Sequence, residues 1–470
     1  MMARSARRIR IAPRLEALER RELLSGDAWL ARDANPATSV LIGFRDGTSA
    51  KVEAAVIRSI HGQVVATYPN GSVLVATPSP SQRALALAGL PRLAAVRYAE
   101  PNSTIHIENT ATNDPGLSTQ WALDSTNGAG IDAAAAWGVT QGSASTIVAV
   151  IDSGLDLTHP EFAGRVWTNA GEANGKPGVD NDGDGLANDL HGWNFLTNTS
   201  DVSDDNGHGT HVTGILAATG NNGIGLAGVN WKAQIMPLKF IGADGNGSVD
   251  DAIRAIYYAV DHGARVINAS WGGGGHVQTL TDAISYANVH NVVFVTAAGN
   301  ESVNNGVRRS YPADDRLPNT ISVAAIDING ALASFSNYGA TTVDLAAPGV
   351  NIRSTVPRGY ATYSGTSMST PYVSGVVSLL VGLHPELTAA QLVQRVLNAA
   401  KPLPSLQGKV ITGGVVDAAN AVNDSYSAAH PGVAVTGHGT KRHPVRHPVR
   451  KLSRRKAIKL HGAMFESHDI

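Results

Sequence analysis

The sequence predicts an α/β fold, a doubly wound and mostly parallel sheet with helices on both faces, preceded by a small α+β domain. From about residue 114 to residue 423, short runs rich in apolar and β-branched residues alternate with helical stretches. The runs are almost continuously apolar, which is typical of parallel strands buried on both faces. In such sheets, ligands bind beyond the carboxyl ends of the strands. We therefore expect reactive side chains where strands end or helices begin.

The small domain is expected over residues 39–107. Its sequence alternates short strands with a helix, from SVLIGF at residue 39 to VRYAEP at residue 96. A polar stretch, IENTATNDPGLSTQ, follows it and has the composition of a linker.

The larger domain is expected over residues 108–424. Six apolar runs are predicted strands, at residues 146–151, 234–240, 265–269, 292–297, 320–325 and 342–346. Four further stretches are predicted helices, at residues 208–219, 249–262, 280–290 and 367–383. Pro371 predicts a break near the start of the last helix.

Length and composition bound the possible chemistry. The chain has 470 residues, enough for two or three domains and a large core. With 43% hydrophobic and 16% charged residues, it is expected to be globular. It contains no cysteine, which excludes thiol nucleophiles, cysteine-ligated zinc, iron–sulfur clusters and disulfides. A nucleophile must therefore be an oxygen or a nitrogen, and a metal must take oxygen or imidazole ligands.

The net charge of −1 conceals basic ends and an acidic middle. Residues 1–25 carry +4 and residues 425–470 carry +7, so the segment between them carries −12. This distribution argues against a nucleic-acid-binding central domain, so no nucleic acid is needed as a partner, although the tail itself could touch polyanions. The basic tail, residues 425–470, is expected to be disordered, with a specific binding arm as the alternative.

Residues 1–38 form an Arg-rich segment without the apolar run of an ordinary signal peptide. Within it, RLEALERRELLSG is similar to the short sorting-type opening of some large bacterial secreted proteins, and a solvated helix is the alternative. The longest apolar run, residues 373–383, is too short for a membrane span. We expect a secreted or cell-envelope-associated protein with no transmembrane segment.

Three segments place a reactive side chain at a strand end or a helix start. AVIDSGLDLTHPE ends a strand at Asp152, NGHGTHVTGILAAT begins a helix at His208, and YSGTSMSTPYVSG begins one at Ser367. Taken singly, each has an ordinary interpretation: a turn former, a helical histidine and an N-cap serine. His208 and His211 could also form a zinc pair, but no acidic third ligand lies at a familiar spacing.

Together, in the order Asp152, His208, Ser367, these segments resemble the subtilisin-like serine protease family, or subtilases. INASWGGG at residue 267, TAAGN at residue 296 and AAPG at residue 346 extend the resemblance over about two thirds of the chain. An α/β-hydrolase is excluded by the order of these residues and by GTSMS, which lacks the G-x-S-x-G elbow.

The chemistry of this set is nucleophilic catalysis on a peptide bond. A serine hydroxyl needs a base within hydrogen-bond reach, which His208 supplies, while Asp152 orients the imidazole. Asn300 and the Ser367 N–H would stabilise the oxyanion. A serine endopeptidase acting on polypeptides is therefore predicted, and a silent pseudoprotease that binds peptides is the alternative.

The resemblance also implies a substrate site and a precursor. Substrate would pair as an extended strand with Ser270, Trp271 and Gly272. Ala298 and Gly299 would line the specificity pocket with Ser310 near its base, implying an apolar or broad preference despite the nearby Arg308 and Arg309. Residues 39–107 resemble the removable pro-segments of these proteases, acting as inhibitor and folding aid, with a permanent accessory domain as the alternative. A monomer is expected.

Two loops predict structural calcium. In DNDGDGLAND, the alternating carboxylates before Gly185 match the start of an EF-hand loop, although His191 replaces the closing Glu. The predicted ligands are Asp180, Asp182, Asp184, the Leu186 carbonyl and Asp189, and a solvated acidic loop is the alternative. The second loop, NNGIGL, resembles the calcium loop of the family. Its predicted ligands are Asn222, Ile224 and Leu226 together with Asp114 and Glu161.

Overall fold

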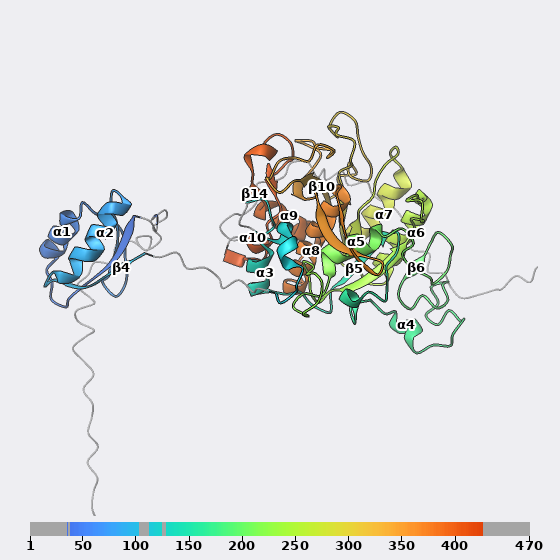
Figure 1. Cartoon of the computed structure of the whole chain (residues 1–470), viewed down its shortest axis with the longest axis horizontal. Helices are drawn as coiled ribbons and strands as arrows, with labels where there is room; N and C mark the ends of the chain where they lie inside the picture. The colour runs from blue at the N-terminus through green and yellow to red at the C-terminus, as the bar shows by residue number, and fades with distance from the viewer. Residues whose placement is uncertain (1–34, 36–37, 103–111, 125–127, 426–470) are drawn as a thin grey trace, which may run out of the picture. The chain divides into compact units, whose positions relative to one another are not determined.

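The computed structural model describes residues 35, 38–102, 112–124 and 128–425. Contacts divide the chain into two units, Met1–Ile107 and Glu108–Ile470 (Figure 1). Most of the Arg-rich start and of the basic tail, and residues 107–111 of the expected linker, lie outside the described residues.

The first unit is a four-stranded antiparallel sheet with two helices, where the sequence predicted one (Figure 1). Its strand order is β2-β3-β1-β4. The core between sheet and helices is small and includes Val40, Ile42 and Val75. The elements are β1 (Ser39–Phe44), α1 (Ala50–Ser59), β2 (Gln63–Thr67), β3 (Val73–Ala76), α2 (Pro80–Gly89) and β4 (Val96–Pro101).

The second unit is built on a nine-stranded sheet in the order β14-β15-β11-β10-β9-β8-β5-β7-β6. All its neighbouring pairs are parallel except β14 with β15. The strands are β5 (Ile147–Asp152), β6 (Trp193–Asn194), β7 (Gln234–Lys239), β8 (Val266–Ala269), β9 (Val293–Ala297), β10 (Thr320–Ile326), β11 (Leu345–Pro348), β14 (Lys401–Pro402) and β15 (Gly414–Val415).

Helices cover both faces of this sheet (Figure 1). Alternate residues of β5 show the division, because Val148 and Val150 pack into one apolar cluster and Ala149 and Ile151 into the other. The first cluster includes α3 (Ala133–Val139), α5 (His208–Ala217), α8 (Thr366–Leu383), α9 (Ala389–Ala399) and α10 (Ala418–Val422). The second includes α6 (Val249–Asp261) and α7 (Gln278–Val289). The predicted fold class is confirmed.

Outside the main sheet lie the short helix α4 (Ala170–Ala173) and a hairpin formed by β12 (Ile352–Val356) and β13 (Gly359–Tyr363). The strand predicted over residues 342–346 begins later, at Leu345, because Thr342 still belongs to a turn bonded to Gly339.

The break predicted at Pro371 is wrong, because this proline lies inside α8. A proline at this position has no N–H for the carbonyl of Ser367, four residues earlier. That carbonyl instead accepts a hydrogen bond of 2.9 Å from Ser270 Oγ. The helix therefore continues, and its first turn is tied to the segment after β8.

The helix α8 is also the one described helix with the length and hydropathy of a membrane span. However, 83% of its 18-residue window is buried inside the protein. Its apolar residues, among them Val373, Val377 and Leu380, belong to the core of the second unit, as expected for a helix at the centre of an α/β fold.

Candidate active site

Asp152 lies at the carboxyl end of β5, inside the sheet, and its side chain has no solvent exposure. Its Oδ1 accepts hydrogen bonds of 2.7 Å from His208 Nδ1 and from the Ser153 N–H. Its Oδ2 has no hydrogen-bond partner among the described residues. The buried carboxylate is thus directed at a single imidazole.

His208 is the first residue of α5, and two glycines let the helix begin there. Gly207 caps the helix with a φ of 95°, a left-handed conformation that side-chain-bearing residues rarely adopt. A Cβ on Gly209 would lie 2.3 Å from the carbonyl oxygen of Gly154. These glycines therefore allow the start of α5 to approach the loop after β5, which carries Asp152.

The environment of His208 favours its protonated form. Burial opposes the charge, but the carboxylate of Asp152 and, to a smaller extent, that of Asp204 outweigh it and raise the pKa of His208. Because Nδ1 is engaged by Asp152, Nε2 is the nitrogen left to exchange a proton with a substrate or nucleophile. The side chain of His208 is 27% exposed, so that proton can be exchanged at the surface of the site.

His211 has a different environment, although it lies one turn further along α5. It is fully buried, its Nε2 lies 3.1 Å from the Ile352 carbonyl oxygen, and its ring stacks on Tyr363 at 4.3 Å. Burial lowers the pKa of His211 to about 4. With His208 bound to Asp152 and His211 held against β12, the two rings do not form the zinc pair considered from the sequence.

Ser367 is the second residue of α8, in the turn where helix N–H groups lack intrahelical acceptors. Its Oγ donates a hydrogen bond of 2.8 Å to the Ser270 carbonyl, while Ser270 Oγ donates in return to the Ser367 carbonyl. Catalytic hydrogen bonds are often incomplete before substrate binds. Engaging His208 would require the Ser367 hydroxyl to leave Ser270.

The side chain of Asn300 is held in one orientation by Thr366. The N–H and the hydroxyl of Thr366 both donate to Asn300 Oδ1, each at 2.9 Å. Asn300 Nδ2 and the Ser367 backbone nitrogen each lie 3.7 Å from the position that a Cβ on Gly365 would take. These two nitrogens therefore both lie near Gly365. Sequence reasoning missed Thr366, because only the fold brings it to Asn300.

The predicted substrate segment follows β8. Trp271 is anchored by a hydrogen bond of 2.8 Å from its Nε1 to the Ile151 carbonyl, and the Gly273 N–H donates to the Tyr311 carbonyl at 3.0 Å. Ala298 and Gly299 follow the neighbouring strand β9. These residues therefore come from the carboxyl ends of two adjacent strands.

Ser310 precedes Tyr311, so its loop lies against the end of the substrate segment. Its N–H donates to Asp314 Oδ2 at 2.7 Å. Burial raises the pKa of Asp314 to about 6, although this N–H and the neighbouring arginines act in the opposite direction. Sequence reasoning did not single out Asp314.

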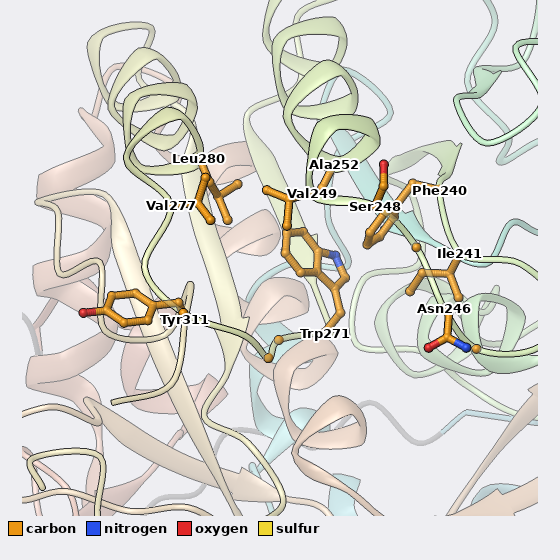
Figure 2. Close-up of a pocket in the computed structure, with 15 residues that line it drawn as sticks. Phe240, Ile241, Asn246, Ser248, Val249, Ala252, Trp271, Val277, Leu280 and Tyr311 are labelled. Carbon is orange, nitrogen blue, oxygen red and sulfur yellow. The ribbon is translucent and has the colours of Figure 1, made fainter. Parts of the chain in front are cut away.

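A cavity of about 230 Å³ lies beside the predicted substrate segment and was not predicted. Figure 2 shows the indole of Trp271 beneath Val249 and Ala252, with Tyr311 across from Leu280. Trp271 and Gly272 belong to the predicted substrate segment and also line the cavity. Its lining is mixed, with Val249, Val277 and Leu280 beside Asn246 and Ser248, and its apolar part suits an apolar side chain.

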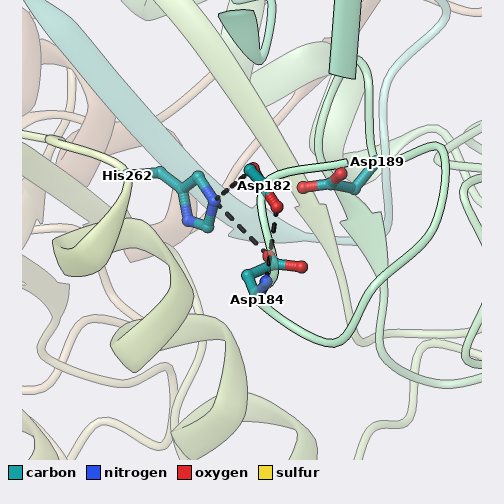
Figure 3. Close-up of side chains that lie close together, drawn as sticks. All are labelled: Asp182, Asp184, Asp189 and His262. Carbon is teal, nitrogen blue, oxygen red and sulfur yellow. Dashed lines mark hydrogen bonds and ion pairs between the residues drawn. The ribbon is translucent and has the colours of Figure 1, made fainter. Parts of the chain in front are cut away.

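The acidic loop of residues 180–189 gathers carboxylates as predicted, but in two groups. Asp182, Asp184 and Asp189 lie together with His262, which follows α6 (Figure 3). Asp180 belongs instead with Asp182 and Glu172. Sequence reasoning missed His262 and Glu172, because both come from outside the loop.

Within the first group, Asp189 is fully buried. Its Oδ2 accepts hydrogen bonds from Tyr258 and Asn169, whereas its Oδ1 has no partner among the described residues. Burial and then the charges of Asp189 and Asp182 raise the pKa of Asp184. A cation would relieve both the repulsion and the unpaired oxygen.

In the second predicted loop, the carboxylates already accept hydrogen bonds from neighbouring groups of the protein. Backbone N–H groups of Asn221 and Asn222 donate to Asp114, and that of Leu226 donates to Glu161. Tyr360 also donates to Glu161 at 2.9 Å. The predicted residues do come together, but hydrogen bonds already occupy the two carboxylates.

A family model described as the subtilase family matches residues 143–434. The chain is 33% identical to subtilisin-like protease 1 of Plasmodium berghei over 69% of this chain and 57% of that protein. It is 39% identical to thermitase of Thermoactinomyces vulgaris over 53% of this chain and 79% of thermitase. A solved structure of proteases from Pseudoalteromonas arctica matches with a TM-score of 0.57 and 28% identity, over 67% of this chain and 99% of that one. The chain spans 49% to 63% of the length of three of its curated relatives.

Proposed function

The chain belongs to the subtilase family, and we propose that it is a serine endopeptidase that cleaves polypeptides through Ser367, His208 and Asp152. The observation that carries this proposal is the 2.7 Å hydrogen bond between His208 Nδ1 and the buried Asp152. It leaves Nε2 available as a base, and Ser367 is held at the end of β8, the strand next to β5, by its hydrogen bonds with Ser270. The donors near Gly365 supply the matching site for negative charge.

In the proposed reaction, Ser367 Oγ attacks the scissile carbonyl carbon while its proton passes to His208 Nε2. Asp152 stabilises the imidazolium, and the Ser367 N–H and Asn300 Nδ2 donate to the oxyanion. As the peptide C–N bond breaks, His208 returns the proton to the departing amine and an acyl-enzyme remains. Water then attacks the ester with His208 as base, releasing the second product and restoring the serine.

Substrate is proposed to bind as an added strand along Ser270–Gly272, because main-chain pairing tolerates varied sequences. The cavity beside Trp271 would receive an apolar side chain of the bound peptide. Ala298, Gly299 and Ser310 would line the pocket for the residue at the scissile bond.

The experiment for this proposal compares the wild-type protein with Ser367→Ala in casein hydrolysis and in labelling by a fluorophosphonate probe. We expect wild type to hydrolyse casein and to take up the probe, and the variant to do neither. Hydrolysis by the variant at near-wild-type rate would refute the mechanism. A wild-type chain that takes up no probe would favour the peptide-binding pseudoprotease.

The first unit is proposed to be a removable pro-segment that acts as inhibitor and folding aid. Its separate sheet and core support independent folding of residues 39–107. Added in trans to the mature enzyme, this segment should inhibit hydrolysis at micromolar concentration. No inhibition would favour a permanent accessory domain. We also propose that the enzyme is secreted or associated with the cell envelope and acts as a monomer.

Calcium is proposed to bind the acidic loop through Asp182, Asp184, Asp189 and the Leu186 carbonyl, with Asp180 at its edge. The unpartnered and buried Asp189 Oδ1 supports this fit. The cation would supply only positive charge that stabilises the loop, with no part in the hydrolytic chemistry. Asp114, Glu161, Asn222, Ile224 and Leu226 are proposed as a second site.

Chelation separates the two calcium proposals. A ligand present at 100 times its Kd stabilises the folded state by about 2.7 kcal/mol, so excess chelator should lower the melting temperature by several degrees. Calcium should reverse the change, and magnesium should do so poorly. Asp189→Asn should abolish the part of this response that comes from the acidic loop, and Glu161→Gln the part that comes from the second site. An unchanged melting temperature, with no calcium by elemental analysis, would refute both sites.

A further inference from the structure

A second carboxylate lies beside the proposed catalytic pair and has no part in the reaction described above. Asp204, in the turn before α5, accepts at Oδ1 from Ser153 Oγ and the Gly207 N–H, both at 2.8 Å, and from the Asn206 N–H at 3.1 Å. At Oδ2 it accepts from the N–H and hydroxyl of Thr210, at 2.8 and 2.6 Å. One carboxylate thus accepts hydrogen bonds from Ser153, which follows Asp152, and from Gly207 and Thr210, which lie on either side of His208 in the chain.

Ser153 completes the connection. It follows Asp152 directly, is fully buried, and accepts a hydrogen bond of 2.8 Å from the Gly209 N–H while donating to Asp204. Gly207 and Gly209 are the residues on either side of His208. The chain therefore has a continuous set of hydrogen bonds from the end of β5, through Ser153 and Asp204, to the first turn of α5.

We propose that Asp204 is a positioning residue for His208, which holds the first turn of α5 against the end of β5 and places a second negative charge beside the imidazolium formed during catalysis. The proposal rests on the proposed peptidase function and deepens it. The positive end of the α5 dipole opposes a cation at His208, and a carboxylate at this helix start offsets that effect. Asp204 also contributes, after Asp152, to the raised pKa of His208.

The other charged or titratable groups on the elements around this turn do not duplicate the arrangement. His211 is buried with a pKa lowered to about 4 and is neutral at physiological pH. Lys239 of β7 lies opposite Asp152 in the sheet, but its Nζ is held by Asp205 and by the carbonyls of Ser153 and Ile241. Asp156, in the loop after β5, donates its N–H to Thr210 Oγ1 at 3.0 Å, and its carboxylate accepts from the Arg358 N–H at 3.0 Å. The β12–β13 hairpin adds Arg353, Arg358, Tyr360 and Tyr363.

The matched comparison is Asp204→Asn against Asp205→Asn. Both remove one carboxylate from adjacent positions, but Asp205 is paired with Lys239 at 2.6 Å and is 54% exposed. We expect Asp204→Asn to lower kcat about tenfold with KM within about twofold of wild type. The acidic limb of its kcat/KM profile should move down by about one pH unit, because the imidazolium loses a neighbouring negative charge. Asp205→Asn should leave that limb unmoved.

A second variant separates geometry from charge. Ser153→Ala retains both carboxylates but removes the bridging hydroxyl, so kcat should fall while the acidic limb stays at its wild-type pH. This variant also decides the positioning role if Asp204→Asn does not fold, and wild-type kcat in Ser153→Ala would then overturn it. If the acidic limb of the kcat/KM profile lies at the same pH in Asp204→Asn and in wild type, the electrostatic role of Asp204 is overturned.

A direct readout avoids turnover. In full-length Ser367→Ala, NMR titration of His208 should give a lower pKa when Asp204→Asn is added and an unchanged one when Asp205→Asn is added. The proposed function fails separately, if Ser367→Ala itself hydrolyses casein. An active wild type with no difference between the two Asp variants overturns only the role of Asp204.

Discussion

The two histidines of α5 lie three residues apart, yet their surroundings drive their pKa values in opposite directions. His208, at the helix start, meets the carboxylates of Asp152 and Asp204, which outweigh burial and raise its pKa. His211, one turn on, meets a carbonyl and the ring of Tyr363, and burial lowers its pKa to about 4. The difference shows that access to a buried carboxylate makes one ring suitable as a base, while its absence makes the other a core residue.

The largest effect expected from this comparison is on catalysis. His208→Ala should lower kcat by about 10⁴-fold, because the serine loses its general base, while the melting temperature changes little. Steady-state hydrolysis of a peptide substrate at pH 8 would measure the loss. A His208→Ala enzyme with more than a tenth of wild-type kcat would contradict the role given to this ring.

The next effect is a loss of stability in acid that originates at His211. Its folded-state pKa is depressed, so the unfolded chain binds a proton below about pH 6.5 that the folded chain does not bind until about pH 4. Stability contributed by the neutral ring is therefore lost as the pH falls through this window, by about 3 kcal/mol in total. Chemical denaturation of Ser367→Ala, which cannot autolyse, would measure it across pH 4–7.

A smaller effect is expected from His211→Phe at neutral pH. The substitution keeps an aromatic ring against Tyr363 but removes the hydrogen bond to the Ile352 carbonyl, which should cost about 2 kcal/mol. It should also flatten the acid dependence described above and leave kcat within about threefold of wild type. If the acid dependence persists in this variant, another group causes it.

The smallest expected effect is a loss of stability as the pH rises, which is opposite in direction to the acid effect of His211. The folded-state pKa of His208 is raised, so its contribution to stability is fully present below about pH 6.5 and is lost as the pH rises through the folded value. In the Ser367→Ala background, His208→Gln should therefore lower the melting temperature more at pH 5 than at pH 8. Calorimetry at both pH values tests this, and equal decreases would contradict it.

Much of the fold followed from short-range pattern. The predicted strand at residues 234–240 differs from β7 only at its last residue, and the helix predicted at residues 249–262 differs from α6 only in the same way. These elements have near-continuous apolar runs or a regular apolar face, which depend on residues close in the chain. Pro371 misled the prediction, because the Ser270 hydroxyl that satisfies the carbonyl it leaves unpaired lies 97 residues from that carbonyl.

In the candidate site, too, some features could be predicted from the sequence and others could not. The chemical types and the places of Asp152, His208 and Ser367, at a strand end and two helix starts, could be predicted from the sequence, and their roles stay predictions. Thr366 could not be linked to Asn300 beforehand, because the two are 66 residues apart and meet only in the packed unit. His262 joins the acidic loop for a similar reason, since the end of α6 reaches it only in the folded chain.

The sequence by itself determined which reactions were open to this protein: no thiol chemistry, three oxygen and imidazole groups in a set order, and oxygen-rich loops. Tertiary structure alone decided which histidine meets a carboxylate, which acidic loop keeps an unpaired buried oxygen and which donors lie near Gly365. The reason is physical. Composition and local periodicity act within a few residues, whereas pKa values and oxyanion geometry depend on groups that only the crossovers of a parallel sheet bring within a few ångströms.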